Sequence, residues 1–172
     1  MQSEHHHRRF DLPFNWPNPA LQVVLIEPEI PPNTGNIARL CAATGSQFNL
    51  VGQLGFRLHD RALRRAGVDY WDEVNIHRYI NFIEWYDSNS QPNFYLFTTA
   101  AQQSFFEITF KPGDALVFGS ESKGLSDELL EKYPSKLVQI PMMTDKVRSL
   151  NLANSVSIAT YEALRQINNN LK

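Results

Sequence analysis

Cysteine is almost missing from this sequence, because the 172 residues contain only one, Cys41. A single cysteine excludes a disulfide within the chain and a zinc site built on cysteines, and it fits a reducing compartment. Long apolar runs are missing too, since none approaches the roughly 18–20 residues that cross a bilayer. The first 20 residues also lack the apolar core of a signal peptide. We therefore expect a cytoplasmic protein with no membrane partner.

Net charge is small as well, at -2 from 16 basic and 18 acidic side chains. A protein that coats nucleic acid with its whole surface is normally basic, so any contact with RNA must be a local patch. The apolar fraction of 42% is enough for a hydrophobic core, which excludes a wholly disordered chain. The length suits one domain, since domains commonly have about 100–200 residues.

Three common motifs of nucleotide-binding and hydrolytic proteins are missing. The segment EPEIPPNTGN (27–36) has one glycine and cannot form the G-x-G-x-x-G turn of dinucleotide-binding folds. GSESKG (119–124) matches neither the phosphate-binding loop G-x-x-x-x-G-K-S/T nor the G-x-S-x-G elbow of serine hydrolases. His5, His6 and His7 could bind a metal or be incidental, and we predict no metal site.

Short apolar runs alternate with helical segments along the chain. Six runs predict strands, at 21–28, 48–52, 74–80, 94–99, 115–120 and 137–142. Helices are expected at 33–45, 59–68, 81–88, 126–133 and 151–169. Asn33 or Thr34 would cap the first helix, and Gly45 would end it. The alternation is typical of an α/β fold with a mainly parallel six-stranded sheet flanked by helices. Residues 1–20 are expected to form a flexible N-terminal extension, and residues 21–172 a single domain.

Four predicted strands lead into segments rich in small and polar residues. EPEIPPNTGN follows the first strand, TTAAQQ (98–103) the fourth, GSESKG the fifth and PMMTDKVRSLN (141–151) the last. Ligands of open parallel sheets bind beyond the carboxyl ends of the strands. We therefore expect one polar pocket at this edge of the sheet, formed by segments that lie far apart in the sequence.

Three segments of the chain resemble the motifs of a known family. NTGNIAR (33–39), LVFGSESKGL (116–125) and IPM…RSLNLANSVSIA (140–159) are similar to the three motifs of the SPOUT, or α/β-knot, RNA methyltransferases. HDRALRRAGVDYW (59–71) resembles a segment of one subgroup. That subgroup methylates the ribose 2′-oxygen of the tRNA wobble nucleotide, a cytidine or a modified uridine. The resemblance extends over residues 21–168, and three motifs in order at the family's spacing are a specific signal.

The resemblance implies a SPOUT fold with a C-terminal trefoil knot, although threaded chains are rare among protein folds. It also implies a homodimer that binds S-adenosylmethionine in the knot and shares its active sites between protomers. The RNA partner would be tRNA, bound through its anticodon stem-loop. By position in the motifs, the cofactor would be bound by Phe97, Thr98, Gly119, Ile140, Met142, Ser149 and Leu150.

The catalytic residues that the resemblance implies come from all three motifs and the last helix: Arg39, Glu121, Ser149, Asn151 and Tyr161. Arginine is a poor base because its pKa exceeds about 12. Arg39 would therefore bind the neighbouring phosphate and stabilise the developing alkoxide, while the proton passes to that phosphate or to water. Glu121 would orient the third motif by accepting hydrogen bonds. Ser149 and Asn151 could cap the last helix and also face the ligand, and Tyr161 would lie at the dimer interface.

Four arginines are candidates for contact with RNA: Arg61, Arg64, Arg65 and Arg148. The first three share one side of the predicted helix at 59–68. They could be a solvated helix face or a phosphate clamp for the anticodon stem-loop. Two other functions stay open at this point, namely the same reaction on another RNA and a noncatalytic RNA-binding protein of the same fold.

Overall fold

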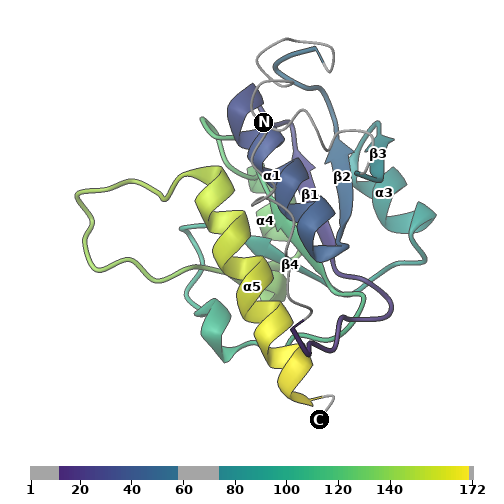
Figure 1. Ribbon diagram of the computed structural model, residues 1–172. Coiled ribbons are helices and arrows are strands. Elements are labelled where there is room, and N and C mark those ends of the chain that lie inside the picture. The colour runs from purple at the N-terminus through teal and green to yellow at the C-terminus, as the bar shows by residue number, and fades with distance from the viewer. Residues whose placement is uncertain (1–11, 58–73, 171–172) are drawn as a thin grey trace, which may run out of the picture.

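The computed structural model describes residues 12–57 and 74–170. In this part of the chain, six parallel strands form one sheet in the order β3-β2-β1-β5-β4-β6 (Figure 1). The strands are β1 (Gln22–Ile26), β2 (Gln47–Val51), β3 (Ile76–Tyr79), β4 (Phe94–Phe97), β5 (Ala115–Phe118) and β6 (Leu137–Val138). The predicted six-stranded parallel sheet is confirmed. The helix predicted at 59–68 lies outside the described residues.

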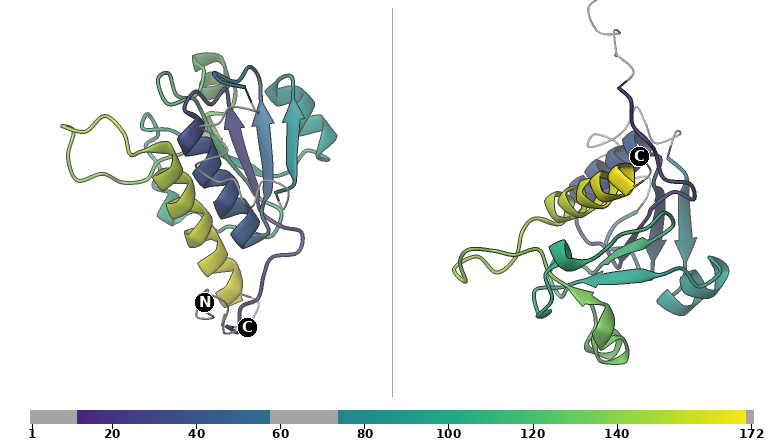
Figure 2. Two further views of the ribbon diagram at one scale, coloured as in Figure 1. Left: turned by 45° about the horizontal axis from the view of Figure 1, so that its top comes forward. Right: turned by 90° about the horizontal axis from the view of Figure 1, so that it is seen from below.

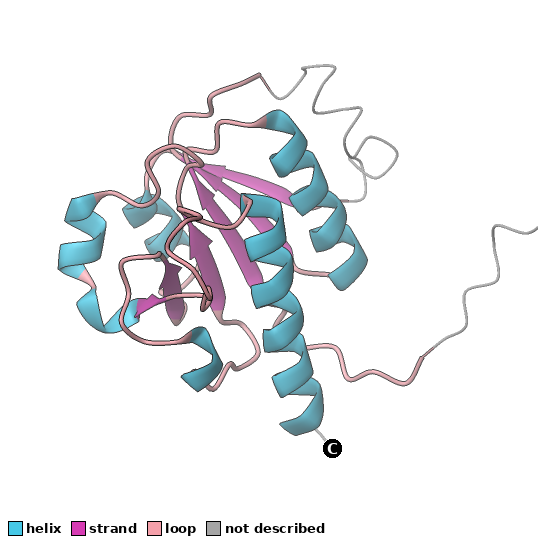
Figure 3. Ribbon diagram, turned by 90° about the vertical axis from the view of Figure 1, so that its left-hand side faces the viewer, coloured by secondary structure: helices cyan, strands magenta, loops and turns pink. Residues whose placement is uncertain are grey.

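Helices cover both faces of the sheet (Figure 3). On one face lie α1 (Pro31–Thr44) and α5 (Leu152–Asn170), side by side (Figure 2), and on the other α3 (Phe82–Ser88) and α4 (Asp127–Lys132). Two short 3-10 helices, Phe105–Glu107 and Pro134–Lys136, lie in the connections. None of the described helices is long and apolar enough to cross a membrane. Two helical layers bury the strands from both sides, which explains why the strands are continuous apolar runs.

Successive residues of the central strand β1 face the two helical layers in turn. Val23 and Leu25 belong to the cluster that contains Leu164 of α5, whereas Val24 belongs to the cluster that contains Trp85 of α3. Val23, Val24 and Leu25 are fully buried. Removal of apolar surface from water is the main favourable contribution to folding, at about 25 cal/mol per Å². The core therefore holds β1 rigidly in place between β2 and β5.

The first helix begins earlier than the sequence predicted. It starts at Pro31 with Ile30 at the N-cap position and no capping bond from that residue's side chain. The predicted caps, Asn33 and Thr34, are therefore wrong, and both residues are buried inside the helix. Proline suits the first helical positions because its φ is already helical and it has no N–H to satisfy. The N–H of Ile30 is satisfied instead by Glu121, a residue from the loop after β5.

The end of α1 matches the prediction, whereas β5 and β6 end earlier than predicted. Gly45 ends α1 as predicted, with a left-handed φ of 68° and its N–H donating to the carbonyl of Cys41. The strands predicted at 115–120 and 137–142 are shorter, because the chain leaves the sheet after Phe118 and Val138 to form loops. The loop after β6 is anchored at Gln139, whose carbonyl accepts from Phe105 N–H at 2.9 Å.

Residues 12–20 of the expected extension lie in the described part of the chain. Phe14 packs against the cluster that α1 and α5 share with the sheet, and its ring centroid lies 4.6 Å from that of Trp16. The backbone N–H of Asn15 donates to Oδ1 of Asn168, near the end of α5, at 2.9 Å. This part of the extension is therefore docked on the last helix.

Cys41 should not react with thiol reagents while the protein is folded. The side chain is buried in α1, and burial raises the pKa of its thiol, so the reactive thiolate is scarce at neutral pH. We expect no labelling of native protein by an aromatic disulfide reagent at pH 8 and one labelled thiol per chain in guanidinium. Because Cys41 is the only cysteine, the absorbance change reports on this site alone. Complete labelling of native protein within minutes would contradict the burial of α1.

Candidate active site

A cavity of about 480 Å³ lies at the carboxyl ends of the strands. Its lining comes from the start of α1, the chain after β4, the loop after β5, and the loop 139–151 with the start of α5. These are the four segments expected to form a pocket, and the parallel strands bring them to one edge of the sheet. The volume lies in the range of about 300–1,000 Å³ that is typical of small-molecule sites.

All seven residues expected to bind a cofactor line this cavity: Phe97, Thr98, Gly119, Ile140, Met142, Ser149 and Leu150. Its apolar part begins at the sheet, where the rings of Phe97 and Phe118 stack with centroids 4.6 Å apart. Three exposed charged side chains line it as well, namely Lys123, Asp127 and Arg148. An apolar wall with a few polar groups suits a flat heteroaromatic ring that carries hydrogen-bonding edges.

The loop after β5 folds back on itself at two glycines. Ser120 and Gly124 exchange backbone hydrogen bonds of 3.1 and 2.8 Å, which form a short antiparallel bridge. Gly119 is buried directly against this bridge, and a Cβ atom there would lie 2.0 Å from the carbonyl carbon of Gly124. Gly124 itself has a φ of 71°, which side chains disfavour. The tight loop therefore leaves no room for a side chain at Gly119, whereas at Gly124 only the backbone conformation favours glycine.

Glu121, at the tip of this loop, binds the segment between β1 and α1. Its carboxylate accepts from the N–H groups of Glu29 at 2.8 Å and Ile30 at 3.2 Å, and from Nδ2 of Asn33 at 3.0 Å. The sequence predicted that Glu121 orients the third motif by accepting hydrogen bonds. Its accepted bonds instead come from the first motif and the residues just before it, and the third motif is reached through Asn33.

Asn151 completes this connection at the start of α5. Its Nδ2 donates to Oδ1 of Asn33 at 3.0 Å, and its own Oδ1 accepts from the N–H of Asn154 at 3.2 Å. Of the two predicted caps, Asn151 therefore occupies the capping position of α5, and the same side chain faces the pocket. A chain of side-chain hydrogen bonds runs from Glu121 through Asn33 to Asn151 and joins all three sequence motifs.

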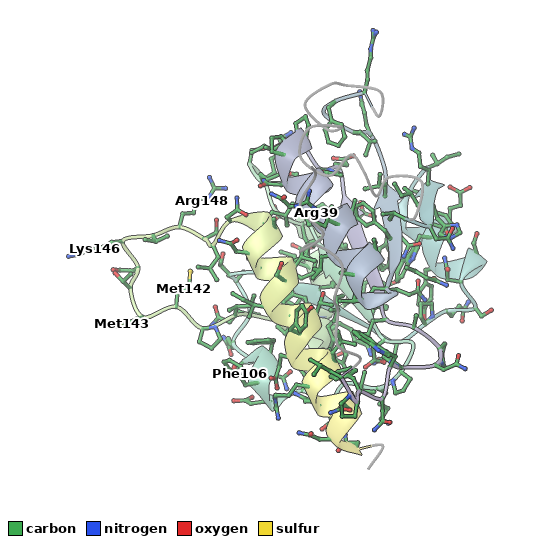
Figure 4. The ribbon with its side chains drawn as sticks, viewed as in Figure 1. Arg39, Phe106, Met142, Met143, Lys146 and Arg148 are labelled. Carbon is green, nitrogen blue, oxygen red and sulfur yellow. The ribbon has the colours of Figure 1, made fainter. Side chains whose placement is uncertain are left out.

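Arg148 lies on the loop 139–151, which extends away from the sheet and returns to α5. Figure 4 shows Met143 and Lys146 far out on this loop and Arg148 on the returning limb. A guanidinium N–H of Arg148 donates to the carbonyl of Ser122 in the loop after β5. Ser122 also donates its N–H and its hydroxyl to the carboxylate of Glu29, at 3.0 and 2.7 Å. These bonds hold the pKa of Glu29 below its usual value.

Two of the expected catalytic residues lie outside the pocket lining. Arg39 is exposed on α1 (Figure 4), and Tyr161 is 55% exposed on α5. Glu121, Ser149, Asn151 and Arg148 all line the pocket. The three other arginines expected to contact RNA, Arg61, Arg64 and Arg65, lie outside the described residues.

Sequence reasoning missed three residues of the hydrogen-bonded site. The sequence pattern indicates Asn33 only as a helix cap and does not distinguish Glu29 or Ser122 from their neighbours. A signal was present, because each of the segments EPEIPPN and GSES carries a carboxylate beside a strand end where ligands bind. Among residues 12–57 and 74–170, no group of three or more His, Cys, Asp or Glu side chains could hold a metal.

Comparisons with known proteins identify the family of this chain. Residues 20–161 match the profile of the SpoU rRNA Methylase family. A tRNA (cytidine(34)-2'-O)-methyltransferase of Burkholderia cenocepacia is 45% identical over 147 residues, which are 84% of this chain and 94% of the relative. A solved structure from work on the 2-OH methylation of C/U34 on tRNA is 41% identical, with a TM-score of 0.80 over 85% of this chain and 95% of the other.

A more distant solved structure, the AdoMet-bound rRNA methyltransferase from Sinorhizobium meliloti, is 26% identical with a TM-score of 0.72. It matches 84% of this chain and 56% of its own. The fold and site therefore define a SpoU-type RNA methyltransferase. The chain belongs to the SpoU rRNA Methylase family, and the resemblance that its three motifs indicated is confirmed.

Gly119→Ala should distort the cavity and weaken the binding of S-adenosylmethionine. The added methyl group would overlap backbone atoms of Gly124 and Leu125, which cannot move without opening the loop. Forced overpacking costs about 1–3 kcal/mol or more, so we expect a lower melting temperature and at least about a tenfold loss of S-adenosylmethionine affinity by calorimetry. Gly124→Ala is the matched control, because it meets no atom within 4 Å and only its backbone is strained. Equal effects of the two variants would contradict the steric explanation.

Proposed function

We propose that this protein transfers a methyl group from S-adenosylmethionine to the ribose 2′-hydroxyl of the wobble nucleotide of tRNA, a cytidine or a modified uridine. The observation that carries the proposal is the pocket itself. All three family motifs line it, and a chain of hydrogen bonds through Glu121, Asn33 and Asn151 joins them. The identity of 45% to a tRNA cytidine-34 methyltransferase, over nearly the whole relative, supports the choice of substrate.

The residues of the pocket fit S-adenosylmethionine. Phe97, Ile140 and Leu150 offer an apolar slot for the adenine ring, and the neighbouring loop backbone offers hydrogen-bonding groups. The same cavity is lined by two acidic side chains, Glu121 and Asp127, and two basic ones, Lys123 and Arg148, and S-adenosylmethionine likewise carries charges of both signs. When bound, the cofactor supplies a methyl group on a sulfonium, a reactive group that needs positioning more than activation.

Arg39 would act on the ribose rather than on the cofactor. It is exposed on α1 and absent from the pocket lining, so a substrate that reaches from the pocket over α1 could contact it. Its guanidinium would bind the phosphate next to the target sugar and stabilise negative charge on the 2′-oxygen as the proton leaves. The phosphate or a water molecule would take the proton, because arginine cannot.

We also propose that the protein is a homodimer whose interface includes the outer face of α5. Ile158 and Tyr161 are 41% and 55% exposed there, although both are large and partly apolar. Asn154 precedes Ile158 by one helical turn on the same face. Exposed apolar side chains that gather on one face mark a contact with another protein. Tyr161 could then act in the active site of the partner protomer.

The proposed knot has indirect support from the order of the elements. β6 lies beyond β4 at one edge of the sheet, and the chain then returns past the loop after β5 to begin α5 on the other side of the pocket. Arg148 and Asn151 tie this returning segment to the loops that it passes. A trefoil knot formed at this position would hold the walls of the pocket together.

The proposed partner is the anticodon stem-loop of tRNA, and the proposed location is the cytoplasm, which fits a single buried cysteine. Lys146 and Arg148 lie on the exposed loop beside the pocket (Figure 4), where they could contact phosphates. A local patch of this kind agrees with the small negative net charge.

Arg39→Ala should abolish methyl transfer and leave cofactor binding intact. Loss of one group that stabilises developing charge costs about 100-fold or more in kcat, while the pocket lining is unchanged. Labelled S-adenosylmethionine and unmodified tRNA would give the rate, mapping of the 2′-O-methyl group would give its position, and calorimetry would give the cofactor affinity. Arg78→Ala, at an exposed position on the distant edge strand β3, is the control. Equal rates for wild type and Arg39→Ala would remove Arg39 from the mechanism.

Ile158→Glu should convert the dimer to a monomer and reduce methyl transfer with it. A carboxylate in the middle of an apolar interface loses hydration without a partner. Light scattering after gel filtration would give the mass, and the tRNA assay would give the activity. Ile83→Glu is a close control, because Ile83 is 44% exposed but lies on α3 at the opposite face of the sheet. A dimeric, fully active Ile158→Glu protein would exclude this interface.

A further inference from the structure

Two glutamates hold each other's segments at the mouth of the site. The N–H of Glu29 donates to Oε2 of Glu121 at 2.8 Å, and the N–H of Ser122 donates to Oε2 of Glu29 at 3.0 Å. The hydroxyl of Ser122 donates to Oε1 of Glu29 at 2.7 Å. Each carboxylate is thus bound by the backbone of the segment that carries the other. We call this arrangement the glutamate clasp, formed by Glu29, Glu121 and Ser122.

The proposed mechanism uses Glu121 but gives no role to Glu29. Both oxygens of Glu29 bind one residue, Ser122, in a bidentate arrangement that fixes direction as well as distance. Hydrogen bonds to an ionised acceptor are shorter and stronger than neutral ones. Glu29 is half-buried, and holding its long side chain in one rotamer costs side-chain entropy. The two bonds to Ser122 offset this cost and fix the position of Ser122 relative to Glu29.

The clasp joins the start of α1 to the loop after β5, and the distance between these two elements matters for the proposed reaction. Glu29 stands two residues before Pro31, where α1 begins, and α1 carries Arg39. Prolines at positions 28, 31 and 32 each have their own φ fixed by the ring, which limits the conformations of the short connection between Glu29 and the helix. On the other side, Ser122 belongs to the loop that lines the pocket, and its carbonyl accepts from Arg148.

We propose that Glu29 is a positioning residue that sets the distance between the cofactor pocket and Arg39 through its bonds to Ser122. This inference rests on the proposed function. Neither Glu29 nor Ser122 lines the pocket, so their side chains can be changed without removing a contact to the cofactor. A misplacement of about 1 Å far from the reacting atoms can cost about 100-fold in rate. Loss of the clasp should therefore slow the transfer step more than it weakens cofactor binding.

A double-mutant cycle tests the inference. Glu29→Gln keeps the shape of the side chain but turns an amide N–H₂ group toward the donors of Ser122, and Ser122→Ala removes the hydroxyl. We expect each variant to lower kcat about tenfold and to change the KM for S-adenosylmethionine less than about threefold. The double variant should be no slower than Glu29→Gln alone, because Glu29→Gln already disturbs both bonds to Ser122 and Ser122→Ala removes only the hydroxyl bond. Ser122→Thr keeps the hydroxyl and should retain the wild-type rate.

The matched controls are Glu131→Gln on α4 and Ser135→Ala in the short helix that follows. Both residues are exposed, belong to neither segment of the clasp and do not line the pocket, and we expect wild-type kcat and KM for both. The melting temperature of every variant is measured as well. A purely structural role would lower the melting temperature without lowering kcat more than it changes the KM for S-adenosylmethionine. In the wild type, carbon-detected titration should give a Glu29 pKa below that of the Ser122→Ala variant.

Several results would overturn the positioning role while the proposed function stands. The first is an active wild type together with an unchanged kcat in Glu29→Gln. The second is a double variant whose fall in kcat equals the product of the two single effects. The third is a rise in KM for S-adenosylmethionine that is as large as the fall in kcat. A wild type that transfers no methyl group to tRNA would instead refute the proposed function, and the positioning role would fall with it.

Discussion

The carboxylate of Glu121 accepts three hydrogen bonds from the chain between β1 and α1, and the geometry of the pocket depends on this interaction. Without it, Ile30 N–H would lack this partner at the start of a helix whose first positions are prolines. Asn33 would also lose the bond that orients its amide toward Asn151. One carboxyl side chain thus accepts a hydrogen bond at a helix start and connects three loops.

The sheet makes this interaction possible. Its strands are parallel and buried from both sides, so their carboxyl ends form one rigid edge, and the loops that leave it start from fixed points. The loop after β5 is further tightened by the bridge between Ser120 and Gly124. Rigid loops can hold a cofactor and an RNA sugar in a reactive geometry without paying for ordering during each cycle. The exposed loop 139–151 and the outer face of α5 remain available to larger partners.

The pocket lining could be predicted because family motifs and strand ends coincide. Phe97, Gly119 and Ile140 lie at or just beyond the ends of strands, Ser149 belongs to the third motif, and parallel strands bring strand ends together. The hydrogen bonds among the loops could not be predicted in this way. Glu29 and Ser122 are 93 positions apart, and nothing in either segment shows which carboxylate meets which backbone N–H group. The wrong caps of α1 have the same origin, because the group that satisfies the helix start comes from another part of the chain.

The sequence by itself determined the alternation of strands and helices, the parallel sheet, the pocket edge and the family, since these depend on local apolar patterns and contiguous motifs. Only the tertiary structure decided where α1 begins, which partner Glu121 holds, and that Asn151 both caps α5 and binds Asn33. It also placed Arg39 and Tyr161 on exposed faces outside the pocket lining. These features depend on distances between segments that only the packing of helices on the sheet can fix.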